Sequence, residues 1–292
     1  MENPSEVNYG IELNNVVKKY KDFSLDHVSF KVPKGNIVGF IGENGAGKTT
    51  TIKALMNLIF LDEGQIRVFG LSYKENEKEI KEQIGIVYDE SCFHETLQVS
   101  DINKIMSNIY KNWDQKVFYS YIEKFNLPDK KVMKEFSRGM KMKLSIAVAL
   151  SHHARLLILD EATSGLDPIV RDEILDIFME FIQDEDHTIL VSSHIISDLE
   201  KIADYIIFIH KGKIVFNRSK DELIYNFGIA RMSEAEFENF PKENQQGVRK
   251  NKFGVEVLVN NKQELMQQKH EYVLDNTTIE EIILFMVKGE LK

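Results

Sequence analysis

The chain has 292 residues, of which 43% are hydrophobic and 28% are charged, as is typical of a folded globular protein with one large or two modest domains. Its formal net charge is −9, whereas proteins that bind DNA or RNA usually carry a positive patch or a positive net charge. We therefore expect no nucleic-acid partner. Cys92 is the only cysteine, which excludes an intrachain disulfide and agrees with a reducing cytoplasm.

Membrane insertion is not expected from the sequence. No apolar run approaches the roughly 20 residues that a transmembrane helix needs. Residues 1–10 are polar and acidic and lack the apolar segment of a signal peptide. We therefore expect a cytoplasmic protein, and if it serves a membrane, another chain must span that membrane.

The first part of the chain is predicted to form strands around a glycine-rich loop. Loose alternation of apolar and polar residues predicts strands at 11–17 and 25–32, with a turn at 33–35. A continuous apolar run at 37–41 predicts a buried strand, and residues 50–56 predict a helix.

Between that strand and that helix lies the phosphate-binding pattern G-x-x-x-x-G-K-[ST], in the structural context that it requires. The glycines allow a tight turn that aims backbone N–H groups at phosphate oxygens, and the helix adds the positive end of its dipole. Lys48 can reach the β- and γ-phosphates of a nucleotide, and the Thr49 hydroxyl can bind Mg²⁺. The flanking elements disfavour the alternative, a glycine-rich turn without a ligand. The predicted binding residues here are Gly42, Glu43, Asn44, Gly45, Ala46, Gly47, Lys48, Thr49 and Thr50.

The middle of the chain is predicted to contain a helical region at about 91–153. It follows a short strand within 62–70, a charged helix at 74–83 and a buried strand at 84–88. The candidate N-cap residues of its helices are Ser100 or Asp101, Asp114 and Ser137.

Three short apolar runs follow, at 156–159, 188–192 and 205–209. They are rich in branched residues, and a predicted helix at 168–182 separates the first two. Continuous apolar strands that alternate with helices are typical of a parallel sheet covered on both faces. A turn at 211–213 then predicts a hairpin.

Beyond about residue 217 the composition shifts towards Asn, Gln, Lys and Glu. A hairpin at 247–260, with its turn at Asn251 and Lys252, and an amphipathic helix at 278–288 indicate a small α+β appendage. We therefore predict a nucleotide-binding domain at 9–217 and a C-terminal accessory domain at 218–292.

Asp160 and Glu161 directly follow the apolar run at 156–159. A protein with this phosphate loop needs a second carboxylate for Mg²⁺ at the end of a buried strand, and Asp160 can supply it through water. Glu161 would orient and polarise the attacking water. An Asp-Glu pair at a strand end can also be a solvated turn, but the phosphate loop elsewhere in the chain favours the catalytic interpretation.

With these residues, several further stretches resemble the ATP-binding cassette (ABC) ATPase family, over roughly residues 9–217. They are Tyr20, like the aromatic residue that stacks on adenine; Phe136-Ser137-Arg138-Gly139-Met140, like the family signature; Ser164-Gly165-Leu166-Asp167, like the D-loop; and Val191-Ser192-Ser193-His194, like the strand with the switch histidine. The resemblance implies an α/β fold: a P-loop NTPase (RecA-like) core with a parallel sheet, an antiparallel β subdomain and the inserted helical subdomain.

The resemblance also implies a dimer that encloses its nucleotides. Each ATP would lie between the phosphate loop of one cassette and the signature of the other, here Ser137, Arg138 and Gly139. His194 would contact the γ-phosphate and hold the water and Glu161 in register. A histidine taken alone is more often structural, but its place in this motif favours the catalytic role.

Two positions depart from the family pattern. Arg138 and Met140 replace the usual glycine and glutamine of the signature, so Arg138 adds a cation beside the phosphates but also bulk. Asp89 stands where the family has a glutamine that contacts Mg²⁺, and its charge makes it a stronger but shorter ligand. Together with the appended C-terminal segment, Asp89 makes the chain similar to a bacterial branch of antibiotic- and peptide-export ATPases of the bacitracin type.

The function implied by the resemblance is that of the ATP-binding and ATP-hydrolysing subunit of an exporter, peripheral on the inner face of the cell membrane. A separate transmembrane permease would carry a peptide, antibiotic or toxin, and a second ATPase chain, the same or different, would complete the dimer. Two alternatives are a soluble ABC protein acting on nucleic acid or ribosomes and an ATP-dependent regulator. The first typically has two cassettes or a long insert, and this chain has neither.

Overall fold

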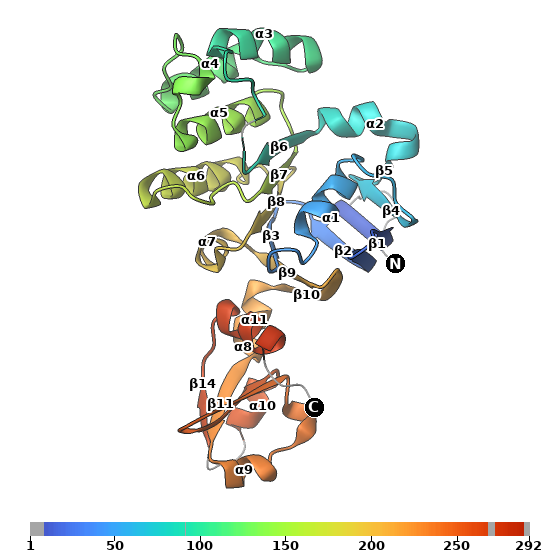
Figure 1. The fold of residues 1–292 in the computed structure, drawn as a ribbon, viewed down its shortest axis with the longest axis vertical. Coiled ribbons are helices and arrows are strands. Elements are labelled where there is room, and N and C mark those ends of the chain that lie inside the picture. The colour runs from blue at the N-terminus through green and yellow to red at the C-terminus, as the bar shows by residue number, and fades with distance from the viewer. Residues whose placement is uncertain (1–8, 91, 268–271, 289–292) are drawn as a thin grey trace.

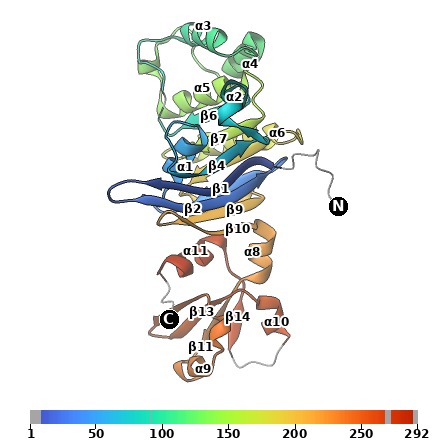
Figure 2. The same cartoon turned by 90° about the vertical axis from the view of Figure 1, so that its right-hand side faces the viewer.

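The structure, a computed structural model, describes residues 9–90, 92–267 and 272–288. Within these residues, three sheets and a group of helices follow one another along the long axis of the molecule (Figures 1 and 2). The helices α3 to α5 lie at one end, the two N-terminal sheets lie in the middle, and the third sheet lies at the other end. The predicted α/β fold is confirmed.

The central sheet has the strand order β10-β9-β3-β8-β7-β6. Its strands are β3 (Ile37–Ile41), β6 (Ile84–Tyr88), β7 (Leu156–Asp160), β8 (Thr188–Ser193), β9 (Tyr205–His210) and β10 (Lys213–Ser219). All neighbours are parallel except β9 and β10. Every residue of β3, β7 and β8 is buried, as expected of strands covered on both faces. Because the strands run in parallel, the carboxyl ends of β3, β6, β7 and β8 meet at one edge.

An antiparallel sheet covers one face of the central sheet. It has the order β2-β1-β4-β5, formed by β1 (Tyr9–Lys19), β2 (Ser24–Pro33), β4 (Glu63–Val68) and β5 (Leu71–Ser72). Val28 of β2, Ile52 of α1 (Lys48–Leu55) and Ile158 of β7 belong to one buried apolar cluster. The helix α2 (Tyr73–Glu82) follows β5.

The other face of the central sheet packs against helices. Leu157 and Leu159 share a second buried cluster with Phe178 of α6 (Pro168–Phe181) and Leu199 of α7 (Ile196–Ile202). Successive residues of β7 therefore contribute to different clusters, as the alternation of side chains along a strand requires.

The inserted helices are α3 (Val99–Ile109), α4 (Gln115–Lys124), the 3₁₀ turn η1 (Met133–Glu135) and α5 (Arg138–Leu150). Asp114 and Ser137 are the N-caps that the sequence predicted, and each accepts hydrogen bonds from backbone N–H groups. The predicted cap of α3 was wrong. Gln98 occupies the cap, and the Asp101 carboxylate reaches back to accept its backbone N–H, because an acidic third residue completes a capping box.

The C-terminal part forms an antiparallel sheet of order β12-β13-β11-β14. Its elements are α8 (Lys220–Asn226), β11 (Gly228–Met232), α9 (Glu234–Glu238), η2 (Lys242–Asn244), β12 (Gly247–Asn251), β13 (Gly254–Val259), α10 (Lys262–Met266), β14 (Val273–Asp275) and α11 (Ile279–Lys288). The turn of the predicted hairpin lies one residue later, at Lys252 and Phe253. The α+β character of this part agrees with the prediction, and the domain boundary near 217 stays a prediction.

The helix α11 packs back onto the N-terminal part of the chain. Ile279 and Ile282 of α11 share a buried cluster with Leu199 of α7 and Leu223 of α8. The backbone N–H of Ile279 also donates to Oε1 of Glu200, at 3.0 Å. In the part of the chain that the structure describes, no helix is long and apolar enough to cross a membrane.

His152, just after α5, gives the fold a pH dependence. Its side chain is 1% exposed, stacks on Tyr110, and lies 3.0 Å from the Ile84 carbonyl oxygen through Nε2. Burial lowers the pKa of His152 below its ordinary value. As the pH falls below about 6.5, the unfolded chain takes up this proton more readily than the folded chain, so the free energy of unfolding decreases.

We expect the melting temperature to fall more steeply between pH 7 and pH 5 in the wild type than in a His152→Gln variant, measured by calorimetry. His94 is exposed and forms no ion pair with any residue that the structure describes, so a His94→Gln variant should keep the wild-type slope. Equal slopes in the wild type and His152→Gln would show that His152 does not cause the dependence.

Candidate nucleotide-binding site

The loop between β3 and α1 needs glycine at defined positions. Gly47, the N-cap of α1, has φ +117°, and a Cβ there would lie 2.9 Å from side-chain atoms of Leu25 and Phe23. A Cβ on Gly42 would lie 2.6 Å from the carbonyl oxygen of Ile209. The loop is therefore held close to the neighbouring strands, and the N–H groups of the first turn of α1 have no carbonyl partner within the helix.

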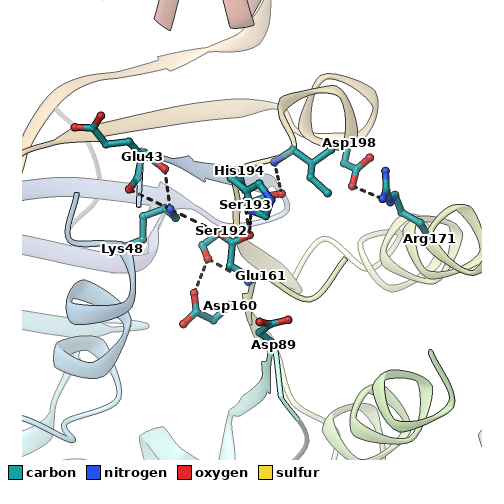
Figure 3. Close-up of polar contacts among 12 residues, drawn as sticks. Glu43, Lys48, Asp89, Asp160, Glu161, Arg171, Ser192, Ser193, His194 and Asp198 are labelled. Atoms are coloured by element: carbon teal, nitrogen blue, oxygen red, sulfur yellow. Dashed lines mark hydrogen bonds and ion pairs between the residues drawn. The ribbon is translucent and has the colours of Figure 1, made fainter. Parts of the chain in front are cut away.

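Lys48, the first residue of α1, is 6% exposed. Its Nζ donates to the carbonyl oxygen of Gly42 at 2.7 Å and lies 3.4 Å from Oε1 of Glu161 (Figure 3). The charge of the lysine is thus kept inside the loop, with a carboxylate from the end of β7 as its ionic partner.

The two carboxylates after the apolar run of β7 have different surroundings. Asp160 is buried, and its Oδ1 accepts a hydrogen bond of 2.6 Å from the Ser192 hydroxyl of β8. Glu161 has φ +56°, in the left-handed region that non-glycine residues rarely adopt. Its backbone N–H donates to the carbonyl oxygen of Ser192 at 3.0 Å, which holds this unusual conformation.

His194 lies beside the Glu161 carboxylate, as Figure 3 shows. Its Nδ1 is 2.6 Å from Oε2 of Glu161, and its backbone N–H donates to the same oxygen at 3.3 Å. Glu161 therefore contacts Lys48 through one oxygen and His194 through the other. Three residues from three motifs, far apart in the sequence, meet at the edge where the parallel strands end.

Arg171 of α6 contacts both the D-loop and the helix α7, which follows His194. Arg171 of α6 donates to the carbonyl oxygen of Leu166 at 3.2 Å, and its Nε lies 3.8 Å from Oδ2 of Asp198 in α7. The two atoms are buried and neither makes a hydrogen bond, so the contact between α6 and α7 is ionic only.

A cavity of about 620 Å³ opens above the loop. It is lined by Asp22, Phe23, Glu43, Asn44, Gly45, Gly47, Lys48, Thr49, Thr50, Asp89, Glu161, Ser164 and His194. Most of the predicted binding residues therefore surround one cavity. Gly42 and Ala46 shape the loop below it, Asp160 is buried beside it, and Tyr20 lies outside the lining, half-exposed at the end of β1.

Asp22 and Phe23 were not predicted as site residues. They belong to the turn between β1 and β2, and the N–H of Tyr20 donates to the carbonyl oxygen of Phe23 at 2.8 Å. The sequence offered one signal for them: Phe23 is an aromatic residue three positions after Tyr20, but we predicted no role for it.

The signature residues do not line the cavity above the phosphate loop. Ser137 caps α5 by accepting the N–H of Met140, and Ser137, Arg138 and Gly139 line a separate cavity of about 370 Å³ with Gly165 and other D-loop residues. Arg138 forms an ion pair with Asp89, the residue after β6. In a single chain, the signature and the phosphate loop thus line different cavities.

The side-chain oxygens near the phosphate loop suit a metal ion that binds together with a nucleotide. Among the described residues, no group of three or more His, Cys, Asp or Glu side chains is arranged to hold a metal ion. The oxygens of Thr49 and Asp160 are hard donors of the kind that Mg²⁺ prefers, and they fit an ion whose other ligands are phosphate oxygens and water.

A glycine loop between a buried strand and a helix, with carboxylates at the end of another parallel strand of the same sheet, defines a P-loop nucleoside triphosphatase. A family model described as ABC transporter matches residues 25–164. The bacitracin transport ATP-binding protein BcrA of Bacillus licheniformis is 38% identical over 70% of this chain and 68% of its own length. The lantibiotic transport ATP-binding protein SrtF of Streptococcus pyogenes is 36% identical over 72% of this chain and 91% of its own length.

A solved structure described as the ATP-binding subunit of an ABC transporter is 25% identical, with a TM-score of 0.68 over 74% of this chain and 92% of that one. The chain therefore belongs to the ABC transporter family of ATP-binding proteins. It is an ATPase that binds ATP, as its resemblance to the ABC family implied.

Proposed function

We propose that this chain is the ATP-hydrolysing subunit of an exporter that moves a peptide, antibiotic or toxin through a separate transmembrane permease. The observation that carries the hydrolytic part is the meeting of Lys48, Glu161 and His194 at one cavity. The export part is supported by the relatives named for bacitracin and lantibiotic transport.

The residues have distinct roles in hydrolysis. Lys48 and the N–H groups of the loop hold the β- and γ-phosphates of ATP, and they stabilise the charge that develops on the transferred group. Glu161 orients and polarises the attacking water, and His194 keeps the Glu161 carboxylate in place through its Nδ1 contact. Thr49 and Asp160 would hold Mg²⁺, which neutralises phosphate charge when bound, whereas the Asp89 carboxylate is paired with Arg138 in the single chain.

Two surfaces complete the nucleotide site in this proposal. The base of ATP stacks on Tyr20, with Phe23 of the same turn at the wall of the cavity. A second cassette supplies Ser137 and Gly139, whose N–H groups at the start of α5 meet the γ-phosphate from the opposite side. Binding of ATP then holds the two chains together, and hydrolysis releases them.

The permease contact is proposed at a surface formed by the end of α1, by α2 and by the end of α3. Ile109 at the end of α3 is exposed, and so are Leu58 and Phe60, which follow Met56 closely in the chain; Phe60 is 90% exposed. Met56, Ile84 and Ile109 help to line a cavity of about 560 Å³ at this surface. A permease segment that inserts there would place the chain at the inner face of the membrane.

We expect the double substitution Phe60→Asp and Ile109→Asp to reduce co-purification with the permease of the proposed exporter by about tenfold or more, and to abolish export, because buried apolar anchors dominate interface energies. ATP hydrolysis by the isolated chain should persist. Phe253, 97% exposed in the C-terminal hairpin, provides the control, since Phe253→Asp should change neither quantity. Normal co-purification and export by the double variant would contradict the proposed contact.

A further inference from the structure

Arg138 and Asp89 form an ion pair between two segments that are 49 residues apart in the sequence. Asp89 directly follows β6, and Arg138 is the first residue of α5. Their side chains are 46% and 49% exposed, so the pair lies at the surface of a cleft between the central sheet and the inserted helices.

On its other side, the Arg138 guanidinium lies close to Gly165 of the D-loop. A Cβ on Gly165 would lie 2.7 Å from Nη1 and 2.9 Å from Cζ of Arg138, and Gly165 has φ +66°. The absence of a side chain at Gly165 therefore makes room for Arg138. The guanidinium is held between Asp89 and the D-loop, and its charge is already paired within its own chain.

The two partners belong to different cavities. Asp89 lines the cavity above the phosphate loop, together with Lys48, Glu161 and His194. Arg138 lines the separate cavity at the start of α5. Both residues also line a third cavity of about 340 Å³ between them. The ion pair thus connects the nucleotide cavity of a chain to the surface that this chain would offer to a second copy.

We propose that Arg138 is a positioning residue for Asp89 and acts within its own chain: it holds the Asp89 carboxylate and cancels its negative charge at the rim of the nucleotide cavity. Without Arg138, that carboxylate repels the polyanionic triphosphate. The inference rests on the proposed nucleotide site, but not on export or on dimer formation.

The test is a double-mutant cycle on ATP binding by the full chain, measured by calorimetry in EDTA and at concentrations where the chain stays monomeric. The Arg138→Gln variant should bind ATP about threefold more weakly than the wild type, a modest effect because the pair is half-exposed and screened. In an Asp89→Asn background, the same Arg138 substitution should have no effect, since both changes remove one interaction.

Two further variants serve as controls. Arg138→Lys keeps the positive charge without the guanidinium fork and should restore most of the affinity. Arg218 and Glu222 form a comparably exposed pair on the C-terminal side, with both side chains 42% exposed and 2.6 Å apart. Arg218→Gln should leave ATP binding unchanged.

A merely structural role of Arg138 would lower the affinity equally in both backgrounds, and that result would overturn the proposal. An arginine that acts only on the nucleotide of a second copy would leave binding by the monomer unaltered, which would also overturn it. ATP binding by the wild type that is lost in Lys48→Ala would still support the nucleotide site. If the wild-type chain does not bind ATP, both the proposed nucleotide site and the proposed role of Arg138 are refuted.

Discussion

Replacing Glu161 with Gln is expected to lower the rate of ATP hydrolysis by about 10²- to 10⁴-fold, the usual contribution of a positioned general base. The amide cannot accept a proton from the attacking water, and it also loses the ionic part of its contacts with Lys48 and His194. Its size is nearly that of the carboxylate, so the cavity should keep its shape. The measurement is phosphate release at saturating ATP.

The binding of ATP should survive this change. In the proposed cycle, a variant that binds but does not hydrolyse ATP accumulates as a closed dimer, which sedimentation can detect. Glu222→Gln on α8 provides a control for the loss of a surface carboxylate. Hydrolysis by Glu161→Gln near the wild-type rate would contradict the catalytic role of Glu161.

Replacing Lys48 with Ala has the second large expected effect, a loss of ATP affinity by about 10- to 100-fold, measured by calorimetry. This range corresponds to one charge-assisted hydrogen bond to phosphate in a partly buried site. The substitution also leaves the Glu161 carboxylate without its cationic partner, so repulsion of the phosphates adds to the loss.

Lys53 lies in the last turn of the same helix and is exposed, so Lys53→Ala is a matched control for the removal of a lysine from α1. It should leave the affinity close to the wild-type value. An unchanged affinity in Lys48→Ala would instead show that the glycine loop is not the phosphate site.

The sequence predicted well those parts of the fold that depend on neighbouring residues. The bounds of β3 and β6 agree with the predicted apolar runs, because a strand buried on both faces needs a continuous apolar segment. The caps Asp114 and Ser137 were found because their side chains bond to N–H groups two or three residues away.

Features that depend on distant residues were missed. The left-handed conformation of Glu161 is held by the Ser192 carbonyl group of another strand, and no local pattern indicates it. The ion pair of Arg138 with Asp89 joins two unusual residues that the sequence could only treat separately. Most elements of the C-terminal part were also missed, since segments such as β14 and α9 are too short for a clear periodicity.

Because α11 contributes to the buried cluster of α7 and α8, it should affect how the chain withstands heat and proteolytic cleavage. A chain cut after residue 217 would lose Leu223, Ile279 and Ile282, and water would reach Leu199, the apolar neighbour that they cover. Because α7 begins two residues after His194, loosening there would reach the switch histidine. The two ends of this elongated molecule should therefore melt in one calorimetric transition, and a shortened form should be inactivated at a lower temperature than the whole chain.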